Sequence, residues 1–223
     1  MSQPKRPLLE FVAVSIAVLV AIHLLLMLGR ISAGAGSIGA ALVSLIFFWV
    51  PIVIILARRR TPAEYGLHFT GWQRELGRGL LVSSIVLPLF AVAYWVVWGL
   101  FFHRSISVHW GTALFLQFPV QLLAIALPEE VFFRGYLQTL FSFVWRTKRR
   151  WPLVGVNAPA IIATSIVFPL AHLASNPSPM RLAVFFPSLL FGVLRERSGS
   201  LVQPVVVHTL ANVTILILEN GVG

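Results

Sequence analysis

Long apolar runs, separated by short polar or positively charged segments, dominate the chain. The first two runs cover residues 11–28 and 38–57, and a third covers residues 80–102. Each run has about the 20 residues that an α-helix needs to cross the hydrocarbon core of a bilayer. The first run also exceeds the roughly 7–15 apolar residues of a signal peptide. We therefore predict three spans here, the first of them uncleaved.

The segments that join these three runs are predicted as loops. A Gly-rich stretch at residues 29–39 separates the first two runs, and Arg58, Arg59 and Arg60 end the second. Residues 61–78 are the most polar part of the chain. We interpret them as a cytoplasmic loop in which Trp72 lies at the level of the lipid headgroups.

The next apolar segment, residues 112–145, is too long for one straight span. As a helix it would reach about 50 Å, whereas the hydrocarbon core is about 30 Å thick. No turn signal divides it into an antiparallel pair, and Pro119 and Pro128 are its expected bends. Pro128 also suits the first turn of a restarted helix, which would place two following carboxylates beside freed backbone groups.

Three further apolar runs follow, at residues 156–174, 182–194 and 201–218. The sequence therefore predicts an all-α, polytopic helical membrane protein with about seven transmembrane helices. Residues 1–110 would form N-terminal transmembrane helices with a cytoplasmic loop and no motif. Residues 111–223 would form a helical core with a polar cluster between its helices.

Composition supports an integral membrane protein. Of the 223 residues, 58% are hydrophobic and 11% are charged, whereas a soluble domain has about 25% charged residues. Cysteine is absent from the sequence, which excludes disulfides, cysteine nucleophiles and thiolate metal sites. The net charge of +10 does not indicate nucleic-acid binding, because the positive residues lie in short segments between apolar runs.

The distribution of positive charge predicts the orientation. With seven spans and a cytoplasmic N-terminus, only three of the positive residues would face outside: Arg30, Arg104 and Arg181. Most of the 17 Lys and Arg residues would lie inside, as the positive-inside rule requires. These are Lys5, Arg6, Arg58, Arg59, Arg60, Arg74, Arg78, Arg146, Lys148, Arg149, Arg150, Arg195 and Arg197.

Three apolar segments carry polar groups at helical spacing. Glu130 and Arg134 are four residues apart and can form an ion pair, while the neighbouring Glu129 points about 100° away on a helix. His172 follows Phe168 by four residues, and the third segment has His208 four residues before Asn212. A lone His is usually structural, but ionisable residues inside a membrane are candidates for function.

These groups permit two kinds of hydrolytic chemistry. A carboxylate beside an imidazole can take a proton from water, and a second His with an Asn amide can donate hydrogen bonds to an oxyanion. Alternatively, Glu129, His172 and His208 could hold zinc, with an open position for water. The HExxH motif of many zinc proteases is absent from the sequence, and no Ser nucleophile has obvious partners.

At these residues the chain resembles the CAAX proteases and bacteriocin-processing enzymes, also called the CPBP or abortive-infection family. The motifs of that family are EExxxR, FxxxH and HxxxN or HxxxD. They match residues 129–134, 168–172 and 208–212, in the same order and on separate predicted helices. The resemblance covers residues 113–218 and includes Gly135, Tyr136 and Leu137 after the arginine and Pro204 before the third motif.

The resemblance implies an intramembrane endopeptidase of the type-2 CAAX prenyl protease kind. In that family the glutamate corresponding to Glu129 activates water with the help of His172, while His208 and Asn212 form the oxyanion hole. Glu130 and Arg134 would brace the site, with Phe168 supporting it. No cofactor is expected, and zinc is the alternative. The expected partners are a membrane-associated protein or peptide and the lipid bilayer, not nucleic acid.

Two other functions remain open. A non-catalytic immunity or scaffold protein could keep the polar cluster as structural glue, and a transporter could use Glu129 and the histidines as a proton relay. The chain lacks the repeat symmetry of many transporters. The expected location is a multi-pass protein of the bacterial cytoplasmic (inner) membrane. Helix lengths place the cavity in the middle to outer part of the bilayer.

Overall fold

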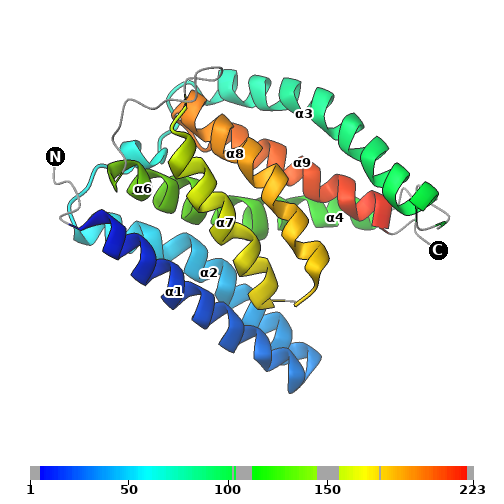
Figure 1. Cartoon of the computed structure of the whole chain (residues 1–223), viewed down its shortest axis with the longest axis horizontal. Coiled ribbons are helices and arrows are strands. Elements are labelled where there is room, and N and C mark those ends of the chain that lie inside the picture. The colour runs from blue at the N-terminus through cyan, green and yellow to red at the C-terminus, as the bar shows by residue number, and fades with distance from the viewer. Residues whose placement is uncertain (1–5, 102, 104–111, 145–155, 176, 220–223) are drawn as a thin grey trace. The chain divides into compact units, whose positions relative to one another are not determined.

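The computed structural model describes residues 6–101, 103, 112–144, 156–175 and 177–219, and within them every regular element is helical (Figure 1). The all-α prediction is confirmed. The predicted loops around residues 104–111 and 145–155, which include the positive cluster at residues 146–150, lie outside the described residues.

Among the described residues, five helices are long and apolar enough to cross a membrane. A shorter apolar helix covers Val202–Leu218. The predicted span at residues 182–194 falls on η6 (Pro179–Val184) and α8 (Phe185–Ser198). The chain is therefore a multi-pass integral membrane protein. The five long helices are Pro7–Gly29, Ala33–Ala57, Trp72–Trp95, Phe115–Val144 and Ala158–Ser175.

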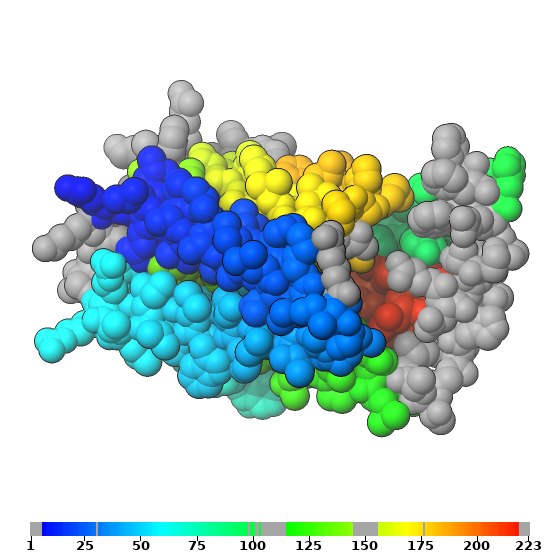
Figure 2. All heavy atoms as spheres, turned by 90° about the horizontal axis from the view of Figure 1, so that it is seen from below, coloured from blue at the N-terminus to red at the C-terminus, as the bar shows by residue number. Residues whose placement is uncertain are grey.

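The structure contains two compact units, and the first comprises Met1–Phe69 and Pro128–Leu201. Its N-terminal helices, α1 (Pro7–Leu26) and α2 (Ala33–Ala57), pack against each other, and α7 (Ala158–Ser175) lies beside α1. Figure 2 shows α1 and α2 side by side on one face of this unit, with α7 next to α1. The remaining helices of the unit are η5 (Val131–Leu137), α6 (Gln138–Val144) and α8.

The prediction of a loop at residues 29–39 is wrong, because α2 already begins at Ala33. Its N-cap is Ser32, whose hydroxyl accepts a hydrogen bond from the Ala35 backbone N–H at 3.1 Å. Glycine here serves helix packing: a Cβ on Gly39 would lie 2.4 Å from the Leu25 carbonyl oxygen. Small residues allow two membrane helices to approach closely in this way.

The long segment after residue 112 is not divided by a turn, as predicted, but the expected restart of the helix at Pro128 is absent: helical stretches follow one another without a break from Thr112 to Val144. Two π-helical stretches interrupt its α-helical geometry: η4 (Val120–Ala126), directly after Pro119, and η5, shortly after Pro128. Proline removes a backbone donor and crowds the preceding turn, and π-helical turns absorb such disruptions without ending the helix. Pro128 therefore lies inside the helix, in the four-residue α5 (Leu127–Glu130).

Aromatic rings form much of the core of the first unit. Phe47 from α2 lies 5.1 Å and 5.3 Å, between ring centroids, from Phe132 and Phe133. Phe133 in turn meets Phe168 from α7 edge-to-face at 4.9 Å. These packed rings hold α2 and α7 against the segment that carries the two adjacent glutamates.

The second unit comprises Thr70–Leu127 and Val202–Gly223, and its main contact is between α3 (Trp72–Trp95) and α9 (Val202–Glu219). Because α3 begins at Trp72, the predicted loop at residues 61–78 is partly helical. Gly79 allows the close approach of α3 to α9, since a Cβ there would lie 3.1 Å from Val206. The Gln203 amide donates a hydrogen bond to the buried carboxylate of Glu75.

Candidate active site

The predicted ion pair between Glu130 and Arg134 is present and fully buried. The Arg134 Nη1 atom lies 3.0 Å from Glu130 Oε1, and the two side chains are 1% and 0% exposed. Sequence reasoning missed a second partner: Arg134 Nη2 donates to the Ser188 hydroxyl at 2.8 Å and to the Ser188 carbonyl oxygen at 3.3 Å. A buried arginine needs such partners for its several donors.

The ring of Phe168 connects this ion pair to the predicted histidine. The Arg134 guanidinium carbon lies 4.4 Å from the Phe168 ring centroid and 5.1 Å from that of Phe191. On its own helix, Phe168 lies 4.6 Å from the His172 ring, between centroids. The FxxxH spacing therefore puts one aromatic ring in contact with both a buried cation and the imidazole.

Hydrogen bonding determines the tautomer of neutral His172. Its Nδ1 atom lies 3.0 Å from the Phe168 carbonyl oxygen. A carbonyl oxygen can only accept, so Nδ1 carries the proton and donates. In the neutral ring Nε2 is then the nitrogen with a lone pair, able to accept a hydrogen bond or a proton.

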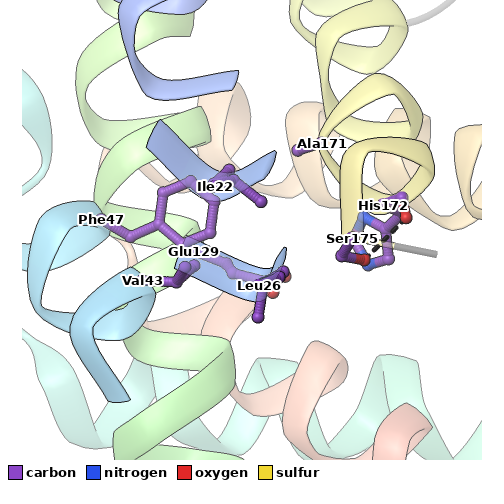
Figure 3. A pocket seen from close by; sticks show the side chains of 8 residues that line it. All are labelled: Ile22, Leu26, Val43, Phe47, Glu129, Ala171, His172 and Ser175. Carbon is purple, nitrogen blue, oxygen red and sulfur yellow. Dashed lines mark hydrogen bonds between the residues drawn. The ribbon is translucent and has the colours of Figure 1, made fainter. Parts of the chain in front are cut away.

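Glu129 and His172 line the same pocket, as Figure 3 shows. The side chains come from α1, α2, α5 and α7, so residues far apart in the sequence meet here. The pocket has a volume of about 80 Å³. Its lining consists of Ile22, Leu26, Val43, Phe47, Glu129, Ala171, His172 and Ser175.

The two adjacent glutamates have different surroundings. Glu130 is fully buried and holds Arg134, whereas Glu129 is half-buried and faces the pocket. A helical rotation of about 100° per residue accounts for this division. Only Glu129 of the pair is placed to meet a molecule that enters the pocket.

His208 and Asn212 belong to α9 of the second unit. They are one helical turn apart on one face, with His208 5% exposed and Asn212 half-buried. Next to them, the Thr209 hydroxyl donates back to the Val205 carbonyl oxygen at 2.7 Å. The structure thus groups the predicted site residues into Glu129, Glu130, Arg134, Phe168 and His172 in one unit and His208 with Asn212 in the other.

Of the three zinc ligands considered from the sequence, Glu129 and His172 share the pocket and His208 lies on α9. Within the residues that the structure describes, no group of three His and acidic side chains is arranged to hold a metal ion. The pocket supplies two potential ligands, fewer than the three protein ligands of catalytic zinc sites.

A second polar cluster, which sequence reasoning also missed, connects α1 to η5, the helical stretch that follows the two glutamates. Arg60 donates to both carboxylate oxygens of Glu10 at 2.7 Å, and the Tyr136 hydroxyl donates to Glu10 at 2.6 Å. Arg60 also donates to the Tyr65 hydroxyl at 3.3 Å. The hydrogen bonds that Arg60 donates to Glu10 raise the pKa of Arg60 above its ordinary value, which stabilises its charged form.

Comparison with known protein families finds a match in the C-terminal part of the chain. Residues 110–214 match the family described as Type II CAAX prenyl endopeptidase Rce1-like. This part of the chain belongs to that family. The assignment made from the three motifs is confirmed, and all three motifs lie within the matched residues. No curated protein and no solved structure matches the chain.

The Rce1-like family assignment and the membrane-spanning helices together indicate that the chain is an intramembrane endopeptidase, without specifying its mechanism. The same family assignment indicates that the substrates are membrane-associated peptides. α1 and α2, which supply half of the residues that line the pocket, lie outside the matched residues.

Proposed function

We propose that the chain hydrolyses a peptide bond of a membrane-associated peptide or C-terminal tail, with Glu129 as the general base. The observation that carries this proposal is that Glu129 and His172, 43 residues apart in the sequence, line one pocket. A carboxylate and an imidazole beside one small cavity are the groups needed to bind and activate a water molecule.

In the proposed reaction, water donates one hydrogen bond to the Glu129 carboxylate and one to His172 Nε2. Glu129 accepts a proton as the water oxygen attacks the carbonyl carbon of the substrate. When the tetrahedral intermediate collapses, the C–N bond breaks and Glu129 returns the proton to the leaving amine. The Nδ1 hydrogen bond of His172 to Phe168 supports this role, because it leaves Nε2 as the acceptor.

The oxyanion would be stabilised by His208 and Asn212, as the family resemblance implies. Both side chains can donate hydrogen bonds, and their spacing on α9 puts them on one face. Removal of a single oxyanion donor typically costs about 10²–10³ in kcat. Asn212→Ala is therefore expected to lower kcat strongly, while leaving the pocket residues unchanged.

The buried groups behind the pocket would keep the general base in place. Glu130 directly follows Glu129, and its ion pair with Arg134 is extended by Ser188 and by the ring of Phe168. We assign Glu130, Arg134 and Phe168 as positioning residues. A carboxylate on a helix that is braced in this way needs little reorganisation at the moment of reaction.

The deciding experiment compares Glu129→Gln with the wild type in detergent micelles, on a peptide library analysed by mass spectrometry. Loss of the proton acceptor should lower cleavage by about 10²-fold or more. Glu64→Gln is the control, because Glu64 lies in the turn Pro62–Tyr65, outside the pocket. Both variants should unfold at the wild-type temperature.

Near-normal cleavage by purified Glu129→Gln would reject the assignment of the base. Absence of any cleavage by the wild type, on peptides and on membrane-inserted tails alike, would favour the non-catalytic immunity or scaffold function. We further propose the bacterial cytoplasmic (inner) membrane, with the N-terminus in the cytoplasm, as the location. The positive-inside distribution of Lys and Arg supports this orientation.

A further inference from the structure

His172 lies in the last turn of α7, where an α-helix is least firmly held. The helix ends at Ser175, so His172 and Ala174 are among its last four residues. The carbonyl groups of such residues have no partner within the helix, and helix ends therefore fray. The imidazole proposed to act on water is thus carried by a turn that needs support from other side chains.

Two side chains supply partners for these carbonyl groups. The Ser175 hydroxyl donates to the His172 carbonyl oxygen at 2.7 Å, within the same turn (Figure 3). His23 Nδ1 lies 3.2 Å from the Ala174 carbonyl oxygen, and because a carbonyl oxygen can only accept, Nδ1 donates. Of these two hydrogen bonds, the one from His23 connects the turn to another helix, α1.

A histidine is a costly residue at position 23. It lies within the membrane-spanning helix Pro7–Gly29, and its side chain is exposed. An ionisable residue inside a membrane is a candidate for function, and a hydrogen bond there is not readily replaced by one to water. Sequence reasoning missed His23, because its partner Ala174 is 151 residues away.

α1 is attached to the site near both of its ends. In its first turn, the Glu10 carboxylate accepts a hydrogen bond from Tyr136 of η5, the stretch that directly follows the two adjacent glutamates. Near its other end, His23 holds the last turn of α7. α1 is one uninterrupted helix between these two points, and Figure 2 shows it beside α7. It therefore connects the segment of Glu129 to the turn of His172.

We propose that His23 is a positioning residue for the reaction, because its Nδ1–H holds the last turn of α7, and with it His172, in place relative to Glu129. This inference rests on the proposed roles of Glu129 and His172, and it adds a residue from outside the segment that matches the family. Without the hydrogen bond the turn frays, and His172 spends less time where it can bind the attacking water. The loss should lower kcat and leave KM nearly unchanged.

Three substitutions at His23 test which ring atom matters. Leu has no donor, the amide nitrogen of Asn lies as many bonds from Cβ as Nδ1 does, and that of Gln lies one bond further, level with Nε2. His23→Leu should lower kcat about tenfold at nearly unchanged KM. His23→Asn should restore kcat to within about threefold of the wild type, and His23→Gln should resemble His23→Leu.

Leu24→Asn is the matched control, because Leu24 is the next residue of α1 and is 62% exposed. It introduces the same amide into the same helix and should keep the wild-type kcat. The comparison of His23→Asn with His23→Gln stays decisive even where His23→Leu loses stability, since the two amides differ only in how far the donor reaches.

Hydrogen exchange tests the bond without requiring catalysis. Mass spectrometry of protein in micelles should find the backbone amides at the C-terminal end of α7 exchanging about tenfold faster in His23→Leu than in the wild type or His23→Asn. The amides of α9 should exchange at the wild-type rate in every variant. Unchanged exchange at the end of α7 in His23→Leu would overturn the inference, whatever happens to kcat.

Unchanged kcat in His23→Leu would also overturn the inference, and it would leave the proposed function standing. Rescue by Gln but not by Asn, or a rise in KM alone, would do the same, because either would show that the ring acts through Nε2 or on the substrate. Failure of the proposed function has a different signature, since cleavage would then survive Glu129→Gln.

Discussion

The ring of Phe168 lies 4.4 Å from the guanidinium carbon of Arg134, and this contact links the first two motifs of the chain. The ring also meets His172 at 4.6 Å, so the buried cation and the imidazole share one aromatic neighbour. A cation over an aromatic face is worth about 2 kcal/mol when both groups are desolvated. The motif phenylalanine is therefore a structural connection between the ion pair and His172, the histidine proposed to act in catalysis.

Replacement of this ring is expected to slow the reaction more than it weakens binding. Phe168→Leu keeps most of the apolar volume and removes both ring contacts, which should lower kcat about tenfold and leave KM nearly unchanged. Steady-state kinetics on one cleaved peptide measure the changes in kcat and in KM separately. Leu170→Phe, at a lipid-exposed position of the same helix, is the control. A rise in KM with unchanged kcat would contradict the positioning role.

The ion pair behind the site should contribute strongly to stability, and it takes no proton in the proposed reaction. Removal of one partner of a buried pair leaves the other charge uncompensated, so Arg134→Met should lower the free energy of unfolding by about 3–5 kcal/mol. Ser188→Ala removes one hydrogen bond to a charged group and should cost about 1.5–3 kcal/mol. Unfolding in mild detergent measures both.

Glu129→Gln should cause a smaller loss of stability, because Glu130 makes the buried 3.0 Å ion pair with Arg134 whereas Glu129 is only half-buried. The contrast between the two adjacent glutamates is thus directly measurable: Glu130→Gln should destabilise the protein, and Glu129→Gln should inactivate it while it stays folded. Equal losses of stability for both substitutions would contradict the division of roles.

The metal-free mechanism predicts that purified active protein contains less than stoichiometric zinc and keeps its activity in chelator. Elemental analysis and activity after dialysis against EDTA check this. One zinc per chain, lost together with activity and regained with it, would establish the alternative with Glu129, His172 and His208 as ligands. His172→Ala would then lower the zinc content as well as the activity.

The sequence alone predicts the fold class and the contacts between residues one helical turn apart. Apolar run length predicts the membrane helices, and four-residue spacing predicts the contacts of Glu130 with Arg134 and of Phe168 with His172. Such local contacts follow from helix geometry alone. The family assignment also followed from short motifs.

Contacts between distant segments could not be predicted in the same way. Ser188 is 54 residues from Arg134, and Glu10 is 126 residues from Tyr136, so no spacing rule connects them. The glycines at residues 29–39 were misinterpreted because glycine is typical both of loops and of tightly packed membrane helices. The pocket wall on α1 and α2 consists of ordinary apolar residues, which carry no signal in a membrane helix.

The orientation of the chain gives the last prediction. A cytoplasmic N-terminus places the connection between α1 and α2 outside the cell and the segment after α2 inside, where Arg58, Arg59 and Arg60 lie. Ile31 is 76% exposed in the first of these segments, and Phe69 is 84% exposed in the second.

A single cysteine placed at either position is the only thiol of the chain, because the native sequence has none. A membrane-impermeant maleimide added to intact cells should label Ile31→Cys, and should label Phe69→Cys only after permeabilisation. The reverse pattern would invert the topology. It would also place the predicted mid-to-outer cavity on the cytoplasmic side, because the depth of His172 along α7 is counted from the same orientation.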